Sequence, residues 1–213
     1  MRPSHGEILL DGLNLFEMET KEIAKKLSFL AQLPVSSEGI TIRQLVSYGR
    51  FPYQGSFGRL RKEDLSILDK SIKLANLMEV ADCSLSEVSG GQRQRAWIAM
   101  ALAQQTGILL LDEPTTYLDV VHQLETMELL RFLNKMEQRT VAMVLHDINL
   151  AARFGDWIIA MRGGNVIATG TPMEIINADV LRKVFQIDAD VVWDSKHSCP
   201  VCLCYDRSDK PLR

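Results

Sequence analysis

Several features that mark membrane-spanning, secreted or nucleic-acid-binding proteins are missing from this sequence. No apolar run approaches the ~20 residues that a helix needs to cross a bilayer. The start, MRPSHGEILLDG, has none of the basic, apolar and small-residue regions of a secretory signal. The 24 basic and 27 acidic residues leave a net charge of only −3, which gives no general attraction for nucleic acid or anionic lipid. We therefore expect a cytosolic protein without a nucleic-acid partner.

Cysteine is also scarce, and its distribution argues against a disulfide-bonded protein. Apart from Cys83, the cysteines are Cys199, Cys202 and Cys204, near the C-terminus. In a cytosolic chain we expect reduced thiols. A C-x-x-C-x-C pattern supplies three thiolates with only His197 nearby as a fourth ligand, so a zinc or iron–sulfur site is the less favoured alternative. In a terminal strand, Cys202 and Cys204 would face the same side.

What remains is the composition of an ordinary globular protein. Hydrophobic residues make up 46% and charged residues 24% of the 213 positions, which argues against disorder and is enough for one sizeable core. The chain shows no repeats and no low-complexity linker. We expect a single domain over residues 1–213.

Apolar strand patterns alternate with helical patterns along most of the chain. Strands are expected over Glu7–Leu10, Lys26–Ala31, Ile108–Leu111 and Thr140–Leu145, a hairpin over Asp156–Met161 and Asn165–Thr169, and a strand pair within Ala189–Asp206. Helices are expected after Thr41, from about Lys62, from Gln92, from Asp119 and near Met173 and Val180, with loops over Ser47–Gly58 and Ser84–Gly91. Apolar strands separated by helices predict an α/β fold whose mostly parallel sheet is buried on both faces.

Two adjacent acids follow one of the apolar strands. Residues 107–119 read GILLLDEPTTYLD, so Asp112 and Glu113 come directly after four aliphatic residues. Ligands of parallel sheets gather at the carboxyl ends of the strands, where His146 is also expected after the strand that starts at Thr140. An acid in this place can hold Mg²⁺ through water, and a second can polarise an attacking water. For an isolated pair, a solvated turn is the simpler interpretation.

A glycine turn precedes one of the helices. Residues 88–95 read VSGGQRQR, so Ser89, Gly90 and Gly91 stand where a helix presents free backbone N–H groups and the positive end of its dipole. Glycine also lets a phosphate approach the backbone closely. A plain serine-capped helix explains the same residues about equally well.

The order and spacing of these segments resemble the ATP-binding subunit of an ABC transporter. The resemblance rests on VSGGQRQR at 88–95, LLLDEP at 109–114, LD at 118–119, His146 after a strand, and Gln32. It implies an ABC-type P-loop NTPase fold with a mostly parallel sheet and a helical subdomain, here over residues 41–88. It also implies ATP and Mg²⁺ as ligands, with a second ATPase subunit and integral membrane permease subunits as partners. The chain would then lie on the inner face of the cell membrane.

The resemblance assigns a role to each matching position. It implies that Glu113 is the catalytic base and His146 the switch histidine that senses the γ-phosphate. Asp112 and Gln32 would associate with Mg²⁺, and Asp119 would link the two nucleotide sites. The signature turn of Ser89, Gly90, Gly91 and Gln92 would contact a γ-phosphate held by the partner. Outside this context, His146 is simply a residue that ends a strand and Gln32 a surface amide.

One motif of the family is absent. The sequence contains no G-x-x-x-x-G-K-[ST] and no Gly-Lys dipeptide at all, and the strand expected over Glu7–Leu10 resembles one that follows this phosphate loop in the family. The lysine, the early strands and the adenine-stacking aromatic are expected to be missing with it. We expect the lost strand to neighbour Ile108–Leu111 in the sheet and to leave an apolar edge exposed. The 213 residues alone would then bind ATP weakly or not at all.

Further segments narrow the resemblance to one branch. VSYGRFPYQ at 46–54 and GTPMEIINADVLRKVFQIDADVV at 170–192 are similar to importers of iron–siderophore complexes, haem and cobalamin. Residues Pro34–Tyr53 would line the groove that receives the permease, although an ordinary aromatic loop over a helical subdomain explains them about as well. A non-catalytic remnant that pairs with an intact ATPase is the main alternative. A chromosome-maintenance ATPase is disfavoured because the chain has no long coiled coil and no basic surface.

Overall fold

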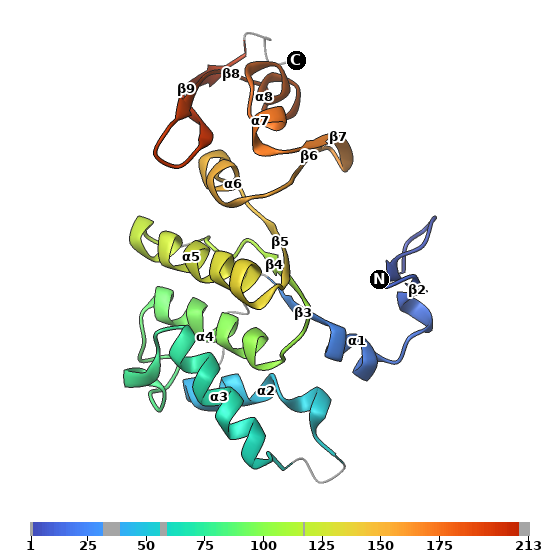
Figure 1. Ribbon diagram of the computed structural model, residues 1–213, viewed down its shortest axis with the longest axis vertical. Helices are drawn as coiled ribbons and strands as arrows, with labels where there is room; N and C mark the ends of the chain where they lie inside the picture. Colours follow the sequence, from blue (N-terminus) through green and yellow to red (C-terminus); the bar gives the residue numbers. More distant parts are fainter. Residues whose placement is uncertain (1, 32–38, 56–58, 117, 209–213) are drawn as a thin grey trace. The chain divides into compact units, whose positions relative to one another are not determined.

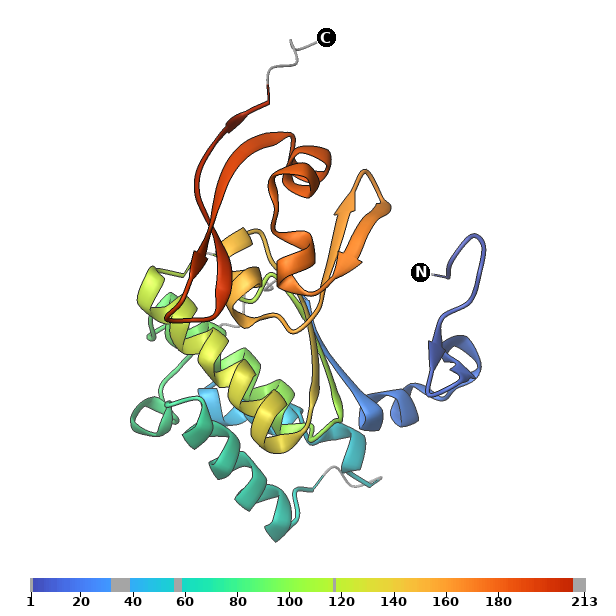
Figure 2. The same cartoon turned by 45° about the horizontal axis from the view of Figure 1, so that its top comes forward.

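The computed structural model describes residues 2–31, 39–55, 59–116 and 118–208, and these form two compact units (Figures 1 and 2). The N-terminal unit comprises Met1–Val144 and the C-terminal unit Leu145–Arg213, and each is described by itself. Within the described residues, no helix combines the length and the apolar character needed to cross a membrane. The expected single domain over 1–213 and the helical subdomain over 41–88 stay predictions.

A three-stranded parallel sheet forms the centre of the candidate site. Its strands are β3 (Leu27–Leu30), β4 (Ile108–Asp112) and β5 (Thr140–Val144), in the order β3-β4-β5. The register pairs Leu111 with both Leu30 and Met143. The expectation that a further strand borders Ile108–Leu111 is wrong, because β4 already has a neighbour on each side.

Three helices of the N-terminal unit build its largest core. These are α2 (Ile42–Tyr48), α3 (Lys62–Leu74) and α4 (Gly90–Ala103), joined through the short 3-10 turns η2 (Phe51–Tyr53) and η3 (Met78–Val80). Thr41 closes a capping box with Gln44, as the sequence indicated. The expected loop over Ser47–Gly58 is partly wrong, since its first two residues end α2 and η2 lies within it. The core residues are Ile42, Leu45, Val46, Leu68, Ile72, Ala75, Leu77, Ala81, Leu85, Val88, Ala96, Ala99 and Ala103.

A buried ion pair joins the ends of these helices. Arg50 Nε lies 2.8 Å from Asp64 Oδ1, and both side chains are only 6% exposed. Burial raises the pKa of Asp64, but the backbone N–H of Arg61 and the Arg50 guanidinium outweigh this and hold the pKa below its usual value. A second Arg50 nitrogen donates to the Ala103 carbonyl at 2.8 Å, which ties the end of α4 to α2.

The N-terminal segment is less regular than the apolar pattern indicated. The strand expected over Glu7–Leu10 is only β1 (Leu9–Leu10), which pairs in antiparallel register with β2 (Leu13–Asn14). The 3-10 turn η1 (Leu15–Glu17) and helix α1 (Thr20–Lys26) follow, and neither was expected. Because α1 ends at Lys26, the next strand starts one residue later than predicted.

The last helix of the N-terminal unit, α5 (Val120–Glu137), begins where the sequence predicts it to begin. Asp119 is its N-cap, and the carboxylate accepts a hydrogen bond from the backbone N–H of His122 at 2.9 Å. The apolar residues Met127, Leu130 and Leu133 recur at helical spacing and are buried. The spacing of apolar residues therefore gave both the type and the start of this element.

The C-terminal unit contains two antiparallel hairpins and three short helices. Its elements are α6 (Ile148–Phe154), β6 (Ile158–Arg162), β7 (Asn165–Gly170), α7 (Pro172–Ile175), α8 (Ala178–Phe185), β8 (Ile187–Asp194) and β9 (Cys199–Arg207). The turn between β6 and β7 needs a left-handed backbone at Gly163 and Gly164, with φ of 56° and 79°. The predicted hairpin, the strand pair and the two short helices near Met173 and Val180 are present, whereas α6 was not expected.

A register shift in the last hairpin changes the environment of the cysteines. Asp190 pairs with Cys204 and Val191 with Cys202, so Leu203 is passed over. The expectation that both thiols face the same side therefore does not hold: Cys202 is buried and Cys204 is exposed. Burial raises the pKa of the Cys199 and Cys202 thiols, which makes them less reactive.

Candidate functional site

The two acids lie at the carboxyl end of the central strand. Asp112 is the last residue of β4, and Glu113 follows it with a left-handed backbone, φ 51°. Both side chains are half-buried. The Thr116 hydroxyl donates to Glu113 Oε2 at 3.0 Å, and the Thr116 backbone N–H donates to the Glu113 carbonyl at 3.2 Å. Two hydrogen bonds between Glu113 and Thr116 therefore close the turn that follows β4.

A buried glutamine connects this acidic turn to α4. Gln94 is 3% exposed, and its side-chain N–H donates to the Pro114 carbonyl at 2.9 Å. Because Gln94 lies one turn into α4, the hydrogen bond fixes that helix against the turn that follows Asp112 and Glu113. Nothing in the local sequence pattern pairs Gln94 with a carbonyl 20 residues away, so its role could not be predicted from the sequence.

The glycine turn is the N-terminus of α4. Ser89 and Gln92 form a reciprocal capping box: the Gln92 N–H donates to Ser89 Oγ at 3.2 Å, and the Ser89 N–H donates to the Gln92 side-chain oxygen at 3.0 Å. Gly90 and Gly91 are already helical, so the expected loop over Ser84–Gly91 ends two residues early. Ser89 and Gly90 are exposed, and the first N–H groups of a helix have no intrahelical acceptor. This geometry suits an anion approaching α4 from outside.

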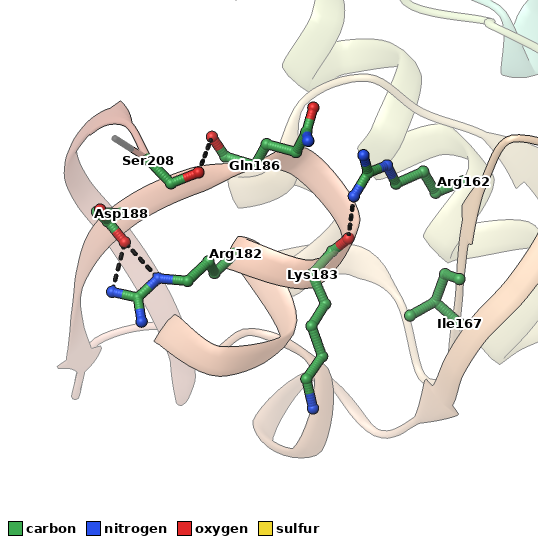
Figure 3. Close-up of a pocket in the computed structure, with 7 residues that line it drawn as sticks. All are labelled: Arg162, Ile167, Arg182, Lys183, Gln186, Asp188 and Ser208. Carbon is green, nitrogen blue, oxygen red and sulfur yellow. Dashed lines mark hydrogen bonds and ion pairs between the residues drawn. The ribbon is translucent and has the colours of Figure 1, made fainter. Parts of the chain in front are cut away.

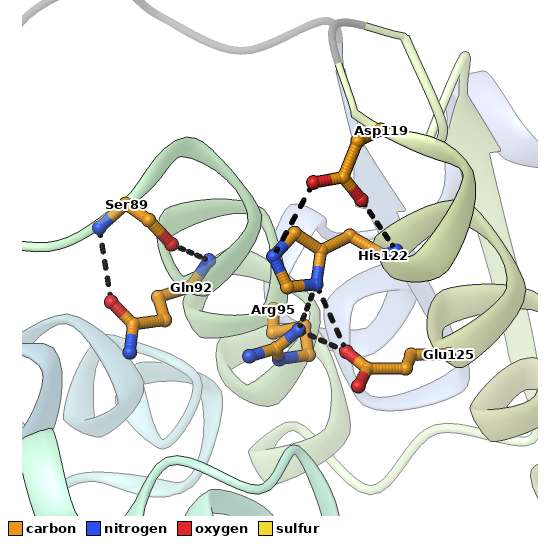
Figure 4. A network of polar contacts seen from close by, with 6 residues as sticks. All are labelled: Ser89, Gln92, Arg95, Asp119, His122 and Glu125. Atoms are coloured by element: carbon orange, nitrogen blue, oxygen red, sulfur yellow. Dashed lines mark hydrogen bonds and ion pairs between the residues drawn. The ribbon is translucent and has the colours of Figure 1, made fainter.

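Asp119 and the glycine turn meet at the junction of α4 and α5. Asp119 is exposed and caps α5, and His122 from the first turn of α5 lies against Gly91 (Figure 4). A Cβ atom built on Gly91 would lie 2.5 Å from His122 Cδ2, so only glycine permits this approach. The N-terminal unit therefore holds Ser89–Gln92, Asp112, Glu113 and Asp119 on connected elements.

Two predicted site residues lie elsewhere. His146 is exposed in the C-terminal unit, just before α6, whose N-cap is Asp147. Its role toward the acids stays a prediction. Gln32 lies outside the described residues, as does Pro34 at the start of the expected permease groove.

Magnesium would need few protein ligands at this site. Among the residues that the structure describes, no group of three or more His, Cys, Asp or Glu side chains could hold a metal ion. A half-buried Asp112 at a strand end nevertheless fits Mg²⁺, which keeps several waters and often takes only one or two carboxylates.

One cavity of the C-terminal unit is lined by none of the predicted site residues. It has a volume of about 670 Å³ and is lined by Arg162, Ile167, Arg182, Lys183, Gln186, Asp188 and Ser208 (Figure 3). Its two guanidinium groups already have partners. Arg182 pairs with Asp188 at 2.5 Å, and Arg162 donates to the Lys183 carbonyl at 2.9 Å. These contacts tie the end of α8 to β8 and β6.

The acidic strand end and the glycine-capped helix define the class of protein. The family model described as ABC transporter matches residues 1–116, more than half of the chain, and the chain belongs to this family. This confirms the resemblance inferred from VSGGQRQR and LLLDEP, and with it an α/β ABC ATPase fold. ABC ATPases bind ATP, and cassettes of this kind dimerise and associate with permeases.

Two bacterial import proteins and one solved structure are similar to this chain over most of its length. The chain is 51% identical over its full length to the iron(3+)-hydroxamate import ATP-binding protein FhuC of Bacillus subtilis, of which it covers 80%. It is 43% identical over 95% of its length to the petrobactin import ATP-binding protein FpuD of Bacillus anthracis, of which it covers 74%. The ATP-binding cassette MJ0796, solved as a dimer in a post-hydrolysis state with ADP and Pi, is similar with a TM-score of 0.69 and 32% identity. That match covers 80% of this chain and 75% of the cassette.

Proposed function

We propose that this chain is the ATP-hydrolysing subunit of an ABC importer for iron(III)–siderophore complexes. The observation that carries the proposal is the hydrogen bond from Gln94 to the Pro114 carbonyl. It joins α4, the helix that begins with the signature turn, to the turn after Asp112 and Glu113. The siderophore class is supported by the 51% and 43% identity to import proteins named for hydroxamate and petrobactin. In this role the chain works at the inner face of the membrane, paired with a second copy and bound to permease subunits.

The chain's own groups then act at different points of the reaction. Glu113 accepts a proton from the attacking water, and its left-handed backbone and the Thr116 hydroxyl aim the carboxylate. Asp112 would hold Mg²⁺ through water, and the ion would supply charge neutralisation of the triphosphate. Gln32 is proposed as a further contact of the ion, and His146 as the group that senses the γ-phosphate.

The signature turn acts on the nucleotide of the partner subunit. The exposed N-terminus of α4, from Ser89 to Gln92, offers backbone N–H groups and a dipole to a phosphate. Asp119 lies at the neighbouring N-terminus of α5, where it can report the state of one site to the other. Closure of two subunits on ATP and reopening after hydrolysis would drive the permease between its states.

Replacement of the proposed base tests this function. Glu113→Gln keeps the size of the side chain but cannot take up the proton, so we expect uptake of a radiolabelled ferric hydroxamate siderophore to fall at least ~100-fold in cells that depend on this gene. Glu63→Gln on the exposed side of α3 is the matched control and should leave uptake unchanged. Undiminished uptake by Glu113→Gln would remove the proposal, and loss of haem or cobalamin uptake instead would change the substrate.

A non-catalytic remnant is the second candidate, favoured by one observation. The 213 residues contain no G-x-x-x-x-G-K-[ST]. They therefore have neither the phosphate-binding lysine of that motif nor its backbone loop, which cradles the triphosphate. We expect calorimetry on this chain alone to detect no submillimolar ATP affinity. If the DNA upstream of Met1 encodes an in-frame phosphate loop, the enzyme is restored. If it does not, the chain can complete only one site of a pair with an intact ATPase.

A further inference from the structure

Four polar side chains form one network between α4 and α5 (Figure 4). The Arg95 Nη1 atom lies 2.5 Å from Glu125 Oε2 and 3.2 Å from His122 Nδ1. His122 Nδ1 is also 3.1 Å from the same Glu125 oxygen, and His122 Nε2 is 3.9 Å from Asp119 Oδ2. The imidazole therefore has Arg95 and Glu125 on one side and Asp119 on the other.

The position of the imidazole is set by packing as well as by charge. Its Cδ2 edge occupies the space where any side chain at residue 91 would stand. Arg95 is almost fully buried, at 9% side-chain exposure, and its Nε has no hydrogen-bond partner among the described residues. A buried guanidinium needs its few contacts, because an unpaired buried charge costs several kcal/mol. The ring is therefore confined between the glycine turn and a nearly buried ion pair.

These contacts place His122 between two segments that the proposed mechanism uses. The His122 backbone N–H donates a hydrogen bond to the Asp119 carboxylate, while the His122 ring lies against Gly91 of the signature turn. A shift of the ring would change the separation of the two helix N-termini, since both segments rest on it.

We propose that His122 is a positioning residue that fixes the signature turn, Ser89–Gln92, relative to Asp119 and so sets the alignment of the two helix N-termini. The consequence for turnover rests on the proposed function, but the positioning itself does not. Arg95 and Glu125 hold the ring by its Nδ1 side, and glycine at position 91 allows it to lie close to the backbone. The histidine acts through these segments.

Amide hydrogen exchange on the 213-residue chain tests the positioning without nucleotide. The amides to follow are those of Gln92, bonded to Ser89 Oγ, and Gln123, bonded to the Asp119 carbonyl. In His122→Ala we expect both to exchange at least ~10-fold faster, while the amide of Ile72 in the helical core keeps its rate. His122→Asn retains a polar group near the Nδ1 position and should restore most of the protection.

A second histidine provides the matched control. His197 also pairs with a carboxylate, Asp194, but lies in the C-terminal unit, so His197→Ala should leave the exchange of Gln92 unchanged. Where His122→Ala does not fold, Glu125→Gln removes the charge beside Nδ1 at constant volume and should raise exchange in the same direction. Unchanged exchange at Gln92, an equal rise at Ile72, or failure of His122→Asn to restore protection would each overturn the proposal.

The assembled importer gives a second readout. We expect His122→Ala to lower kcat for ATP by ~10-fold or more with little change in KM, because a misplaced signature turn affects alignment more than binding of ATP. His122→Asn should recover much of the loss. If the wild-type importer turns over no ATP, the proposed function fails while the exchange result still decides the positioning. Equal kcat in wild type and His122→Ala contradicts the consequence for turnover.

Discussion

The helical core and the parallel sheet of the N-terminal unit cover their apolar residues to different extents. In the helical core, Ile42, Val46 and Ile72 are completely buried among α2, α3 and α4. In the sheet, Leu109 of the central strand is 1% exposed, but Phe29 on β3 is 59% exposed and Val144 on β5 is 52% exposed. The helices therefore close a core by themselves, whereas the edge strands leave apolar surface that parallel sheets usually cover on both faces.

This difference shows which region buries its core without contacts from the rest of the molecule. The helices have short-range connections and a buried ion pair, so their core depends on contacts within residues 42–103. Asp112 ends β4, the central strand of the sheet, and Glu113 follows it directly. The candidate carboxylates are thus placed at the part of the sheet that is least affected by its exposed edges.

The largest expected effect concerns the buried ion pair of the helical core. Asp64→Asn leaves the Arg50 guanidinium buried without an anion, and we expect the free energy of unfolding to fall by about 3–5 kcal/mol. Asp69→Asn is the matched control, because its carboxylate lies on the surface with 58% exposure and pairs with Arg43, which has a second partner. Its loss should be below about 1 kcal/mol. Urea unfolding measures both, and equal losses would show that burial does not distinguish the pairs.

The same pair should make stability depend on acid. A carboxylate whose pKa is lowered on folding contributes stability that is complete above its ordinary pKa and is lost as the pH falls through the lowered one. The difference between the wild type and Asp64→Asn should therefore shrink below a pH of about 4. A difference that stays constant down to pH 2 would contradict this origin.

A truncation in the sheet should cost less than loss of the ion pair and depend on the strand. Leu109→Ala on β4 removes a buried side chain and should cost about 2–4 kcal/mol by urea unfolding. Phe29→Ala on β3 removes an exposed ring, so we expect less than about 1 kcal/mol and slower aggregation on concentration. If both variants lost the same stability, β3 would be buried in solution and the contrast between the regions would disappear.

The smallest effect compares two equivalent helix caps. Thr41→Ala and Ser89→Ala each remove the hydroxyl of a capping box. Each should lower the free energy of unfolding by about 1 kcal/mol, which thermal unfolding measures. Only Ser89→Ala should also impair siderophore uptake, since Thr41 has no place in the site. Equal uptake by the two variants would reduce Ser89 to a structural cap.

Local patterns in the sequence predicted the elements better than their arrangement. The apolar run before Asp112 and the helical spacing after Asp119 gave β4 and α5 almost to the residue, because burial on one or two faces imposes a period. The order of strands around β4 was predicted wrongly, since neighbours in a parallel sheet come from crossover connections and not from local residues. Helix α1 was missed because its short polar sequence, TKEIAKK, shows little periodicity.

The same distinction between local patterns and long-range arrangement applies to the residues of the candidate site. Motif spacing identified the acids, the glycine turn and Asp119, which the structure places on connected elements of one unit. It did not identify Gln94 or His122, because their partners lie 20 and 27 residues away and meet them only through helix packing. The pairing of Arg95 with Glu125 was missed for the same reason, so long-range polar contacts needed the structure.

The backbone of Glu113 has a consequence for anyone who tries to stabilise this protein. A side chain in the left-handed region costs about 1 kcal/mol, and glycine occupies that region without the penalty. A screen that rewards only thermal stability would therefore favour Glu113→Gly, and the selected variant would lack the carboxylate that the proposed mechanism uses. Under the proposed function, stability and ATP turnover therefore favour different residues at position 113.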